Sequence, residues 1–356
     1  MKAYVFGAGA SVHARYPLAS KLWPSVEEWA RKEPLAHIYR SAADNLNELF
    51  DTSKPFEMFL TELDDRISHT SDQFLVSLRN HAQMMVYDYL NSIRGHPAEL
   101  YRLFAESILT PQDTVITFNY DVSLDRELRR SGKWNVLTGY GFVMDQPFGF
   151  ATDQPTASLL CKLLKLHGST NWIAQVLGGL QGAGAVNPDE PLLGWRPVIP
   201  TPEMIYLGTD LVDRRFRMGT GFAPMLIMPA ANKKFFIPTS FDRRELEGFW
   251  NSLWLQAREA IAASDEVHII GYSLPEYDNR ARDLLLRTMR RETEVSICCR
   301  SGTNGLIKLF RDSGFANTRV GADGTFEGWV KTILGISGSR TQSNPSAETG
   351  LPLAVQ

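Results

Sequence analysis

The chain has 356 residues, of which 44% are hydrophobic, and a formal net charge of −3. A chain of this length and composition buries a substantial core and is expected to form two lobes of an ordinary globular protein. The small charge excludes a general attraction to nucleic acid or membranes, and three cysteines are too few for a four-thiolate zinc site. Without a signal-like leader or a membrane-length apolar run, the sequence predicts a cytoplasmic protein.

The first stretch with a chemical signature follows the first predicted strand. Residues 4–6 are a short apolar run of strand type, and residues 7–11 continue at once as GAGAS. Small residues at this place let backbone N–H groups approach a pyrophosphate, and the Ser11 hydroxyl adds a further donor. The usual dinucleotide pattern has a third glycine where this chain has Val12, and an acidic residue about twenty positions on. Both are missing here, so a plain tight turn is the alternative interpretation.

Residues 13–110 are predicted to form a helical insertion. Apolar residues recur at helical spacing within 23–29, 35–50, 55–67 and 71–94, and Ser71 is the expected N-cap of the last helix. That helix carries one apolar stripe, made of Phe74, Leu78, Ala82, Met85, Tyr89 and Ile93. Such stripes indicate core or helix packing, and we assign them no chemistry.

The sheet resumes with a β-branched strand at residues 114–118. Asn119 and Asp121 follow it directly, before a helix led by Val122. Polar groups at the carboxyl end of a buried strand stand where open α/β sheets bind ligands. Both residue types are also common helix caps, so a structural interpretation stays open.

A second strand of this kind, residues 163–166, ends at His167 with Gly168 directly behind it. A lone histidine is more often structural than catalytic, but the glycine leaves room for a substrate at the imidazole. From 174 to 222 the chain is rich in glycine and proline, which predicts a loop-dominated segment.

The last third of the chain predicts plain βαβ structure. The expected strands are 266–270, 294–299 and 318–320, and the expected helices are 276–291, 303–312 and 326–334. The fold class is therefore α/β, a doubly wound parallel sheet with an inserted helical subdomain. We expect a catalytic domain of residues 1–12 and 111–335, the insertion at 13–110, and a disordered tail at 336–356.

Four motifs in order resemble the sirtuin fold. They are GAGAS (7–11), NYD (119–121), LHGS (166–169) and IGYSLPEYD (270–278), and together they are most similar to the bacterial sirtuin-like proteins of anti-phage defence that consume NAD. The resemblance covers roughly residues 1–12 and 111–300. It departs from protein-deacylating sirtuins because the paired CxxC zinc motifs are absent and no IPDFR-like segment follows the GAGAS turn, so no zinc is expected.

The resemblance implies roles for particular residues. Asn119 would hold the ribose or the water, Asp121 would meet the nicotinamide carboxamide, and His167 would act as base. The remaining implied contacts are to the nucleotide, with the pyrophosphate at Gly7, Ala8, Gly9 and Ser11 and the adenosine side at Gly271, Ser273 and Asp278.

The resemblance implies an NAD glycohydrolase that forms nicotinamide and ADP-ribose, as an effector of anti-phage defence. The alternatives are an NAD-dependent protein deacylase and a non-catalytic NAD or ADP-ribose sensor. An unregulated NAD hydrolase would harm its own cell, so we expect a homo-oligomer switched on by a separately encoded ATPase or nucleic-acid sensor. Surplus apolar residues of the insertion would form the contact, with Trp23, Trp29, Phe56, Phe59, Met84 and Met85 as candidates; the alternative is that they pack inward.

Overall fold

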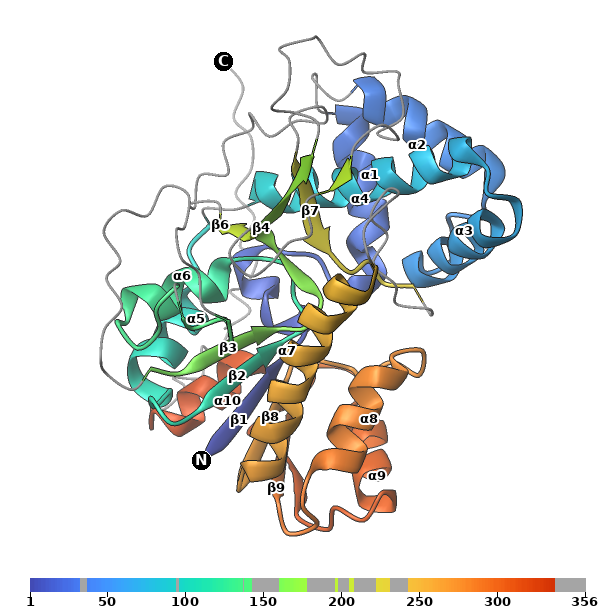
Figure 1. Cartoon of the computed structure of the whole chain (residues 1–356). Helices are drawn as coiled ribbons and strands as arrows, with labels where there is room; N and C mark the ends of the chain where they lie inside the picture. The colour runs from blue at the N-terminus through green and yellow to red at the C-terminus, as the bar shows by residue number, and fades with distance from the viewer. Residues whose placement is uncertain are drawn as a thin grey trace, which may run out of the picture.

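The computed structural model describes residues 1–32, 37–93, 96–136, 138–142, 160–177, 196–197, 205–207, 222–230 and 243–336. Within them, six parallel strands form one sheet in the spatial order β3-β2-β1-β8-β9-β10 (Figure 1). The strands are β1 (Lys2–Phe6), β2 (Thr114–Thr117), β3 (Lys162–Lys165), β8 (Glu266–Ile270), β9 (Glu294–Cys298) and β10 (Thr318–Val320). The chain builds from β1 out to β3 and then returns to place β8 beside β1. This is the predicted doubly wound order, and its switch point lies between β1 and β8.

Helices cover both faces of this sheet, which explains why its central strands are buried along nearly their whole length. Figure 1 shows α7 in front of the sheet and α5, α6 and α10 behind it, with α1 to α4 gathered beyond its upper edge. The helices are α1 (Ala19–Lys32), α2 (His37–Leu49), α3 (Phe56–Thr70), α4 (Gln73–Ile93), α5 (Glu99–Leu103), α6 (Ser123–Arg130), α7 (Arg243–Ala263), α8 (Asn279–Thr288), α9 (Thr303–Asp312) and α10 (Phe326–Ile333). A π-helical turn, η3 (Phe104–Ile108), continues α5.

The helix ends correct two predictions. Ser71 does not cap α4; it ends α3 with a left-handed φ of 54°, and Asp72 accepts the backbone N–H of Phe74 at 2.8 Å instead. Phe74 is 50% exposed, outside the buried stripe to which the sequence assigned it. The helix expected from residue 276 begins only at Asn279, because Asp278 caps it by accepting from the N–H of Ala281 at 3.2 Å.

A second, antiparallel sheet was not predicted. Its strands are β4 (Gly168–Leu177), β5 (Arg196–Pro197), β6 (Ile205–Leu207) and β7 (Phe222–Leu226), and β4 pairs with each of the others. The expectation of a loop from residue 174 was therefore wrong for the end of β4. Short strands separated by glycine and proline carry too little alternation to be recognised.

The six apolar residues of the insertion that were candidates for a partner contact pack inward, contrary to the surplus surface expected from the sequence. Of the six candidates, five are buried, and Trp29 is half-buried against Tyr39 and Tyr89. Trp23 stacks on Phe56 with ring centroids 5.1 Å apart. These residues are therefore core, and they supply no surface for a partner copy.

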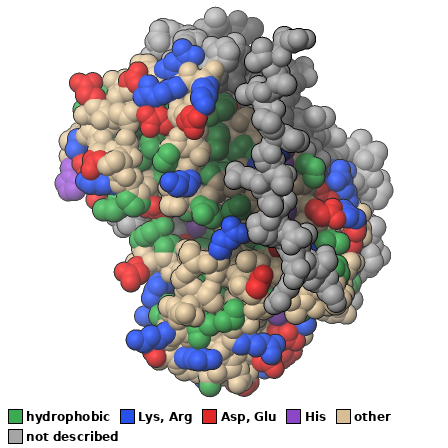
Figure 2. Space-filling model, turned by 180° about the vertical axis from the view of Figure 1, so that it is seen from behind, with side chains coloured by type: hydrophobic (Ala, Val, Ile, Leu, Met, Phe, Trp, Pro, Cys, Tyr) green, Lys and Arg blue, Asp and Glu red, His purple; other side chains and the backbone are tan. Residues whose placement is uncertain are grey.

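The surface shows mixed charge. On the face in Figure 2, Lys and Arg side chains are interspersed with Asp and Glu side chains rather than forming one basic area, as the net charge of −3 led us to expect. Among the described helices, none has the length and apolar character needed to cross a membrane. The predicted tail lies, beyond Ile336, outside the described residues.

Candidate functional site

The turn after β1 packs directly on the turn after β8, at the switch point of the sheet. The N–H of Gly7 donates to the carbonyl of Ile270 at 3.0 Å, and the N–H of Gly9 donates to the carbonyl of Gly271 at 2.8 Å. A Cβ on Gly271 would lie 2.1 Å from the Ala10 nitrogen, and its φ is +64°. The glycines of both motifs are thus needed for a close approach of backbone to backbone.

The outer surface of this junction is where a nucleotide could lie. Ala8, Gly9 and Gly271 are half-buried, and Ser273 is exposed. Because the N–H groups of Gly7 and Gly9 already bond to the protein's own carbonyls, only part of the predicted pyrophosphate cradle has donors to offer. This junction stays a predicted binding surface rather than an observed one.

Ser11 is the centre of a buried hydrogen-bond network. Its hydroxyl donates to Asp121 Oδ2 at 2.7 Å and accepts from Asn119 Nδ2 at 3.0 Å and from the Tyr101 hydroxyl at 2.8 Å. One hydrogen and two lone pairs are all that a hydroxyl has, so Ser11 is saturated. It cannot donate to a pyrophosphate without releasing Asp121, and here it links the first turn to the NYD segment.

Tyr101 was not identified from the sequence, because it lies in a short helix with no motif around it. Its side chain is fully buried, and this burial, together with the nearby Asp121, raises the pKa of its hydroxyl well above the usual value. Tyr101 therefore stays neutral and serves as a hydrogen-bond donor to Ser11.

Asn119 and Asp121 follow β2 and both contact the Ser11 hydroxyl. Asn119 is half-buried, and its Nδ2 also donates to the carbonyl of Gly7 at 2.9 Å, which fixes the amide plane. Asp121 is 6% exposed, and its Oδ1 accepts the N–H of Ser123 at 3.0 Å. Both carboxylate oxygens of Asp121 are thus engaged within the protein. A carboxylate has about four acceptor sites, so Asp121 keeps capacity for the predicted contact with a nicotinamide amide, and its burial is what limits access.

His167 lies at the corner between β3 and β4, two residues after the buried end of β3. Its carbonyl accepts the N–H of Ile227 at 2.9 Å, and its ring packs edge-on against Phe118 with centroids 5.0 Å apart. Gly168 has a φ of +86°, and a Cβ there would lie 2.0 Å from the Met225 carbonyl oxygen. The glycine is therefore required for the corner that presents the imidazole, and the room it leaves is filled by β7 rather than by a ligand.

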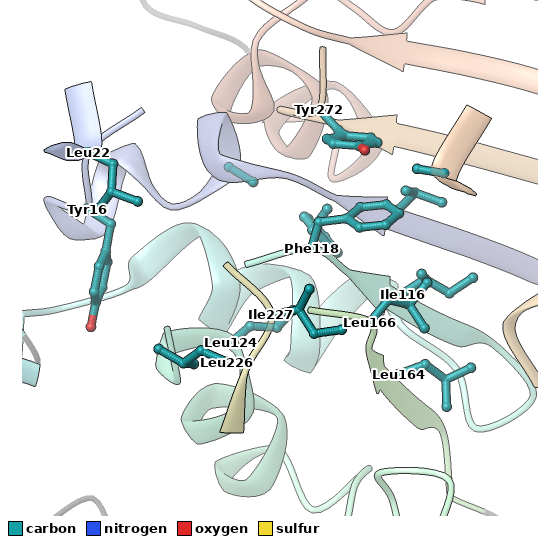
Figure 3. Packing of buried hydrophobic residues seen from close by; sticks show 14 of the residues in the cluster. Tyr16, Leu22, Ile116, Phe118, Leu124, Leu164, Leu166, Leu226, Ile227 and Tyr272 are labelled. Atoms are coloured by element: carbon teal, nitrogen blue, oxygen red, sulfur yellow. The ribbon is translucent and has the colours of Figure 1, made fainter. Parts of the chain in front are cut away.

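Asp278 faces His167, which the sequence did not predict. Its Oδ2 lies 3.8 Å from His167 Nε2 and accepts the Tyr272 hydroxyl at 2.6 Å. Figure 3 shows the Tyr272 ring beside that of Phe118, and their centroids are 4.3 Å apart. The carboxylate expected on the adenosine side is thus beside the predicted base.

Lys165 is a further residue that the sequence analysis missed. Its ammonium is fully buried and donates to the Asp121 carbonyl at 2.6 Å and to Asp125 Oδ2 at 3.0 Å, while Asp125 also accepts from the Tyr140 hydroxyl. The sequence signal that could have identified Lys165 is a lysine placed between two leucines at the end of a buried strand. It holds the NYD segment against β3, so it supports the site without facing it.

The predicted site residues thus gather on the carboxyl ends of four adjacent strands, β3, β2, β1 and β8. His167 and Asp278 form one cluster and Asn119, Ser11 and Asp121 form a second. Phe118 directly precedes Asn119 in the chain and packs against the His167 ring. Within the described part of the chain, no group of three or more His, Cys, Asp or Glu side chains could hold a metal ion. The expectation of a zinc-independent protein stays a prediction.

No protein-family model matches the chain, and no curated protein matches it. Several solved structures similar to this chain are Sir2 proteins. They include a Sir2 homologue in complex with NAD (13% identity, TM-score 0.36, covering 94% of this chain and 90% of that one) and Sir2Tm bound to a propionylated peptide (13% identity, TM-score 0.38, covering 95% and 94%). Likenesses this low do not establish a family or an activity.

Proposed function

We propose that this chain is an NAD glycohydrolase that converts NAD and water to nicotinamide and ADP-ribose. The observation that carries the proposal is the placement of His167 and Asn119 at the carboxyl ends of adjacent parallel strands, next to the glycine junction of β1 and β8. Open α/β sheets bind nucleotides at this edge. The order of the four sequence motifs, which resembles that of sirtuin-like NAD-consuming proteins, supports NAD as the substrate.

For this reaction the protein needs to position the substrate and to supply one base. Nicotinamide in NAD is a cationic pyridinium, so the bond from its nitrogen to the ribose carbon breaks with both electrons going to nitrogen, and a neutral molecule leaves without a general acid. Water then forms the new bond to the ribosyl cation and gives up a proton. His167 would accept that proton, as an imidazole suits this task near neutral pH.

Asn119 is suited to orient the ribose or the water. With Nδ2 held by Gly7 and Ser11, the amide has one orientation, and its Oδ1 is the atom that would contact a hydroxyl. Ala8, Gly9, Gly271 and Ser273 would line the nucleotide at the exposed side of the junction. Ser11 and Asp121 take a supporting part in this proposal, because their polar atoms are engaged with each other and with α6.

We further propose that the activity serves bacterial anti-phage defence, which rests on the motif resemblance alone. Control by homo-oligomer assembly and by a separately encoded ATPase or nucleic-acid sensor belongs to the same proposal. The reason is that a cell must restrain an enzyme that consumes its NAD. The contact surface must differ from the apolar residues named from the sequence, since these are buried or half-buried.

The test is to incubate the purified protein with NAD and follow nicotinamide release, with and without an acetyl-lysine peptide. Release from NAD alone is expected, and His167→Ala and Asn119→Ala should each lower it by about 10²-fold or more while the circular dichroism spectrum is kept. Release that requires the peptide would instead identify a deacylase. Binding of NAD without any cleavage would identify a sensor.

A further inference from the structure

The contact between His167 and Asp278 joins two distant segments of the chain. Nε2 of the imidazole and Oδ2 of the carboxylate are 3.8 Å apart, and the two side chains are 9% and 2% exposed. This separation is too long for a hydrogen bond, but it becomes a close charge contact in a buried site when the imidazole is protonated.

Asp278 is held in this orientation by two bonds of its own. Oδ1 accepts the N–H of Ala281 as the cap of α8, and Oδ2 accepts the Tyr272 hydroxyl. A helix cap needs only one oxygen and no charge, so serine or asparagine would serve α8 equally well. The cap accounts for Oδ1 alone. Oδ2 accepts the Tyr272 hydroxyl and also lies beside His167, and such neighbours lower the cost of burying the carboxylate.

Two tyrosines near the histidine ring carry neutral hydroxyls. The centroid of the Tyr120 ring lies 6.3 Å from that of His167, and the Tyr272 hydroxyl donates to Asp278 beside it. Burial raises the pKa of both tyrosine hydroxyls, so neither ionises near neutral pH. Glu57 and Arg79 act on the Tyr120 hydroxyl, with opposite effects on its pKa. Asp278 places a carboxylate oxygen 3.8 Å from the ring nitrogen.

We infer that Asp278 is a positioning residue for His167 in NAD cleavage, an inference that rests on the proposed function. A carboxylate opposite Nε2 favours the tautomer with its proton on that nitrogen, which gives Nδ1 the lone pair that a base requires. Once the base has taken a proton from water, the same carboxylate stabilises the imidazolium. Asp278 thus belongs to the reaction centre rather than to the adenosine side of the nucleotide.

Asp278→Asn is the test, because asparagine keeps the cap and the shape and removes the charge. We expect kcat for nicotinamide release to fall about 10-fold or more, with a much smaller change in KM. The acidic limb of the pH–rate profile should move to lower pH by about one unit, since the carboxylate no longer favours the protonated ring. Asp283→Asn is the matched control; it removes a carboxylate from the solvent side of the same helix and should change neither quantity.

A second readout is independent of activity. The His167 ring signal in a histidine-labelled NMR spectrum, assigned with His167→Gln, should titrate at lower pH in Asp278→Asn than in the wild type. If the wild type does not cleave NAD, the proposed function fails while this titration still tests the pair. If the titration is unchanged, the pairing is wrong whatever the activity. Should Asp278→Asn fail to fold, Asp278→Ser, which retains a strong helix cap, gives the same comparison.

Discussion

The Ser11 hydroxyl donates its hydrogen bond to the Asp121 carboxylate across 2.7 Å, and both side chains are buried. This bond joins the turn after β1 to the segment after β2. A serine that the sequence motif assigns to a phosphate is therefore committed to the protein in this structure.

Replacing Ser11 by alanine should consequently reduce stability more than NAD binding. The change leaves Asp121 Oδ2, the Tyr101 hydroxyl and Asn119 Nδ2 without their shared partner, and a buried polar group without a partner costs about 1–3 kcal/mol. Urea unfolding measures the loss, and Ser301→Ala, at an exposed serine, should stay within about 0.5 kcal/mol of the wild type. If the Ser11→Ala protein were as stable as the wild type but had a greatly raised KM for NAD, the hydroxyl would instead be a contact to the ligand.

Gly271→Ala tests the junction between the turns after β1 and β8. Alanine in the left-handed region costs about 1 kcal/mol, and its Cβ would in addition lie 2.1 Å from the Ala10 nitrogen. We expect a loss of both stability and nicotinamide release, because the first turn must move. Gly302→Ala separates the two causes, since its φ is +79° with nothing within 4 Å of the Cβ. Equal losses in thermal unfolding for the two variants would mean that the close contact is unimportant.

Much of the sheet could be predicted from the sequence, because long apolar strands bounded by turns carry a strong signal. The strand at residues 266–270 and the helix at 303–312 match the structure at both ends. The small sheet could not be predicted in the same way, since its pairings bring together short strands that lie far apart in the chain. Such strands have little local signal of their own.

The sequence predicted where the candidate site residues lie in the fold better than it predicted which groups their side chains contact. Asn119 and His167 were placed by their positions after strands, which fixes the edge of the sheet where they lie. The direction of each side chain depends on long-range packing. Asp278 illustrates this, because both the cap and the contact with His167 follow from where α8 begins, three residues later than the sequence suggested.

Lys165→Met should destabilise the protein by about 3–5 kcal/mol, because it leaves the buried Asp125 without its cation. Equilibrium unfolding in urea measures the change. Lys331→Met is the matched control, since its pair with Glu327 is exposed and worth less than about 1 kcal/mol. Adding Asp125→Leu to Lys165→Met should recover part of the loss by removing the unpaired charge. No recovery would argue that Asp125 does not depend on Lys165.

We expect His268 to make the stability of the folded protein depend on pH. Its ring is buried on β8, stacked on Tyr4 with centroids 5.1 Å apart and edge-on to Trp329 at 5.3 Å. Burial lowers the pKa of His268 to about 4, against the opposing effect of Glu266 3.3 Å from Nε2; Lys2 and Arg319 add to the lowering. The folded protein therefore keeps this histidine neutral at pH values where the unfolded chain protonates it.

The sign of the effect follows from where the protons bind. Between about pH 6.5 and pH 4 the unfolded chain holds more protons at this position than the folded protein, so stability falls as the pH falls through that window. A shift of this size corresponds to a loss of up to about 3 kcal/mol by pH 4. His268→Phe keeps an aromatic ring of similar size and should flatten the dependence, while His69→Gln, at an exposed histidine, should leave it unchanged. The measurement is the urea midpoint between pH 4 and pH 7.5, and the same slope in wild type and His268→Phe would show that His268 does not contribute.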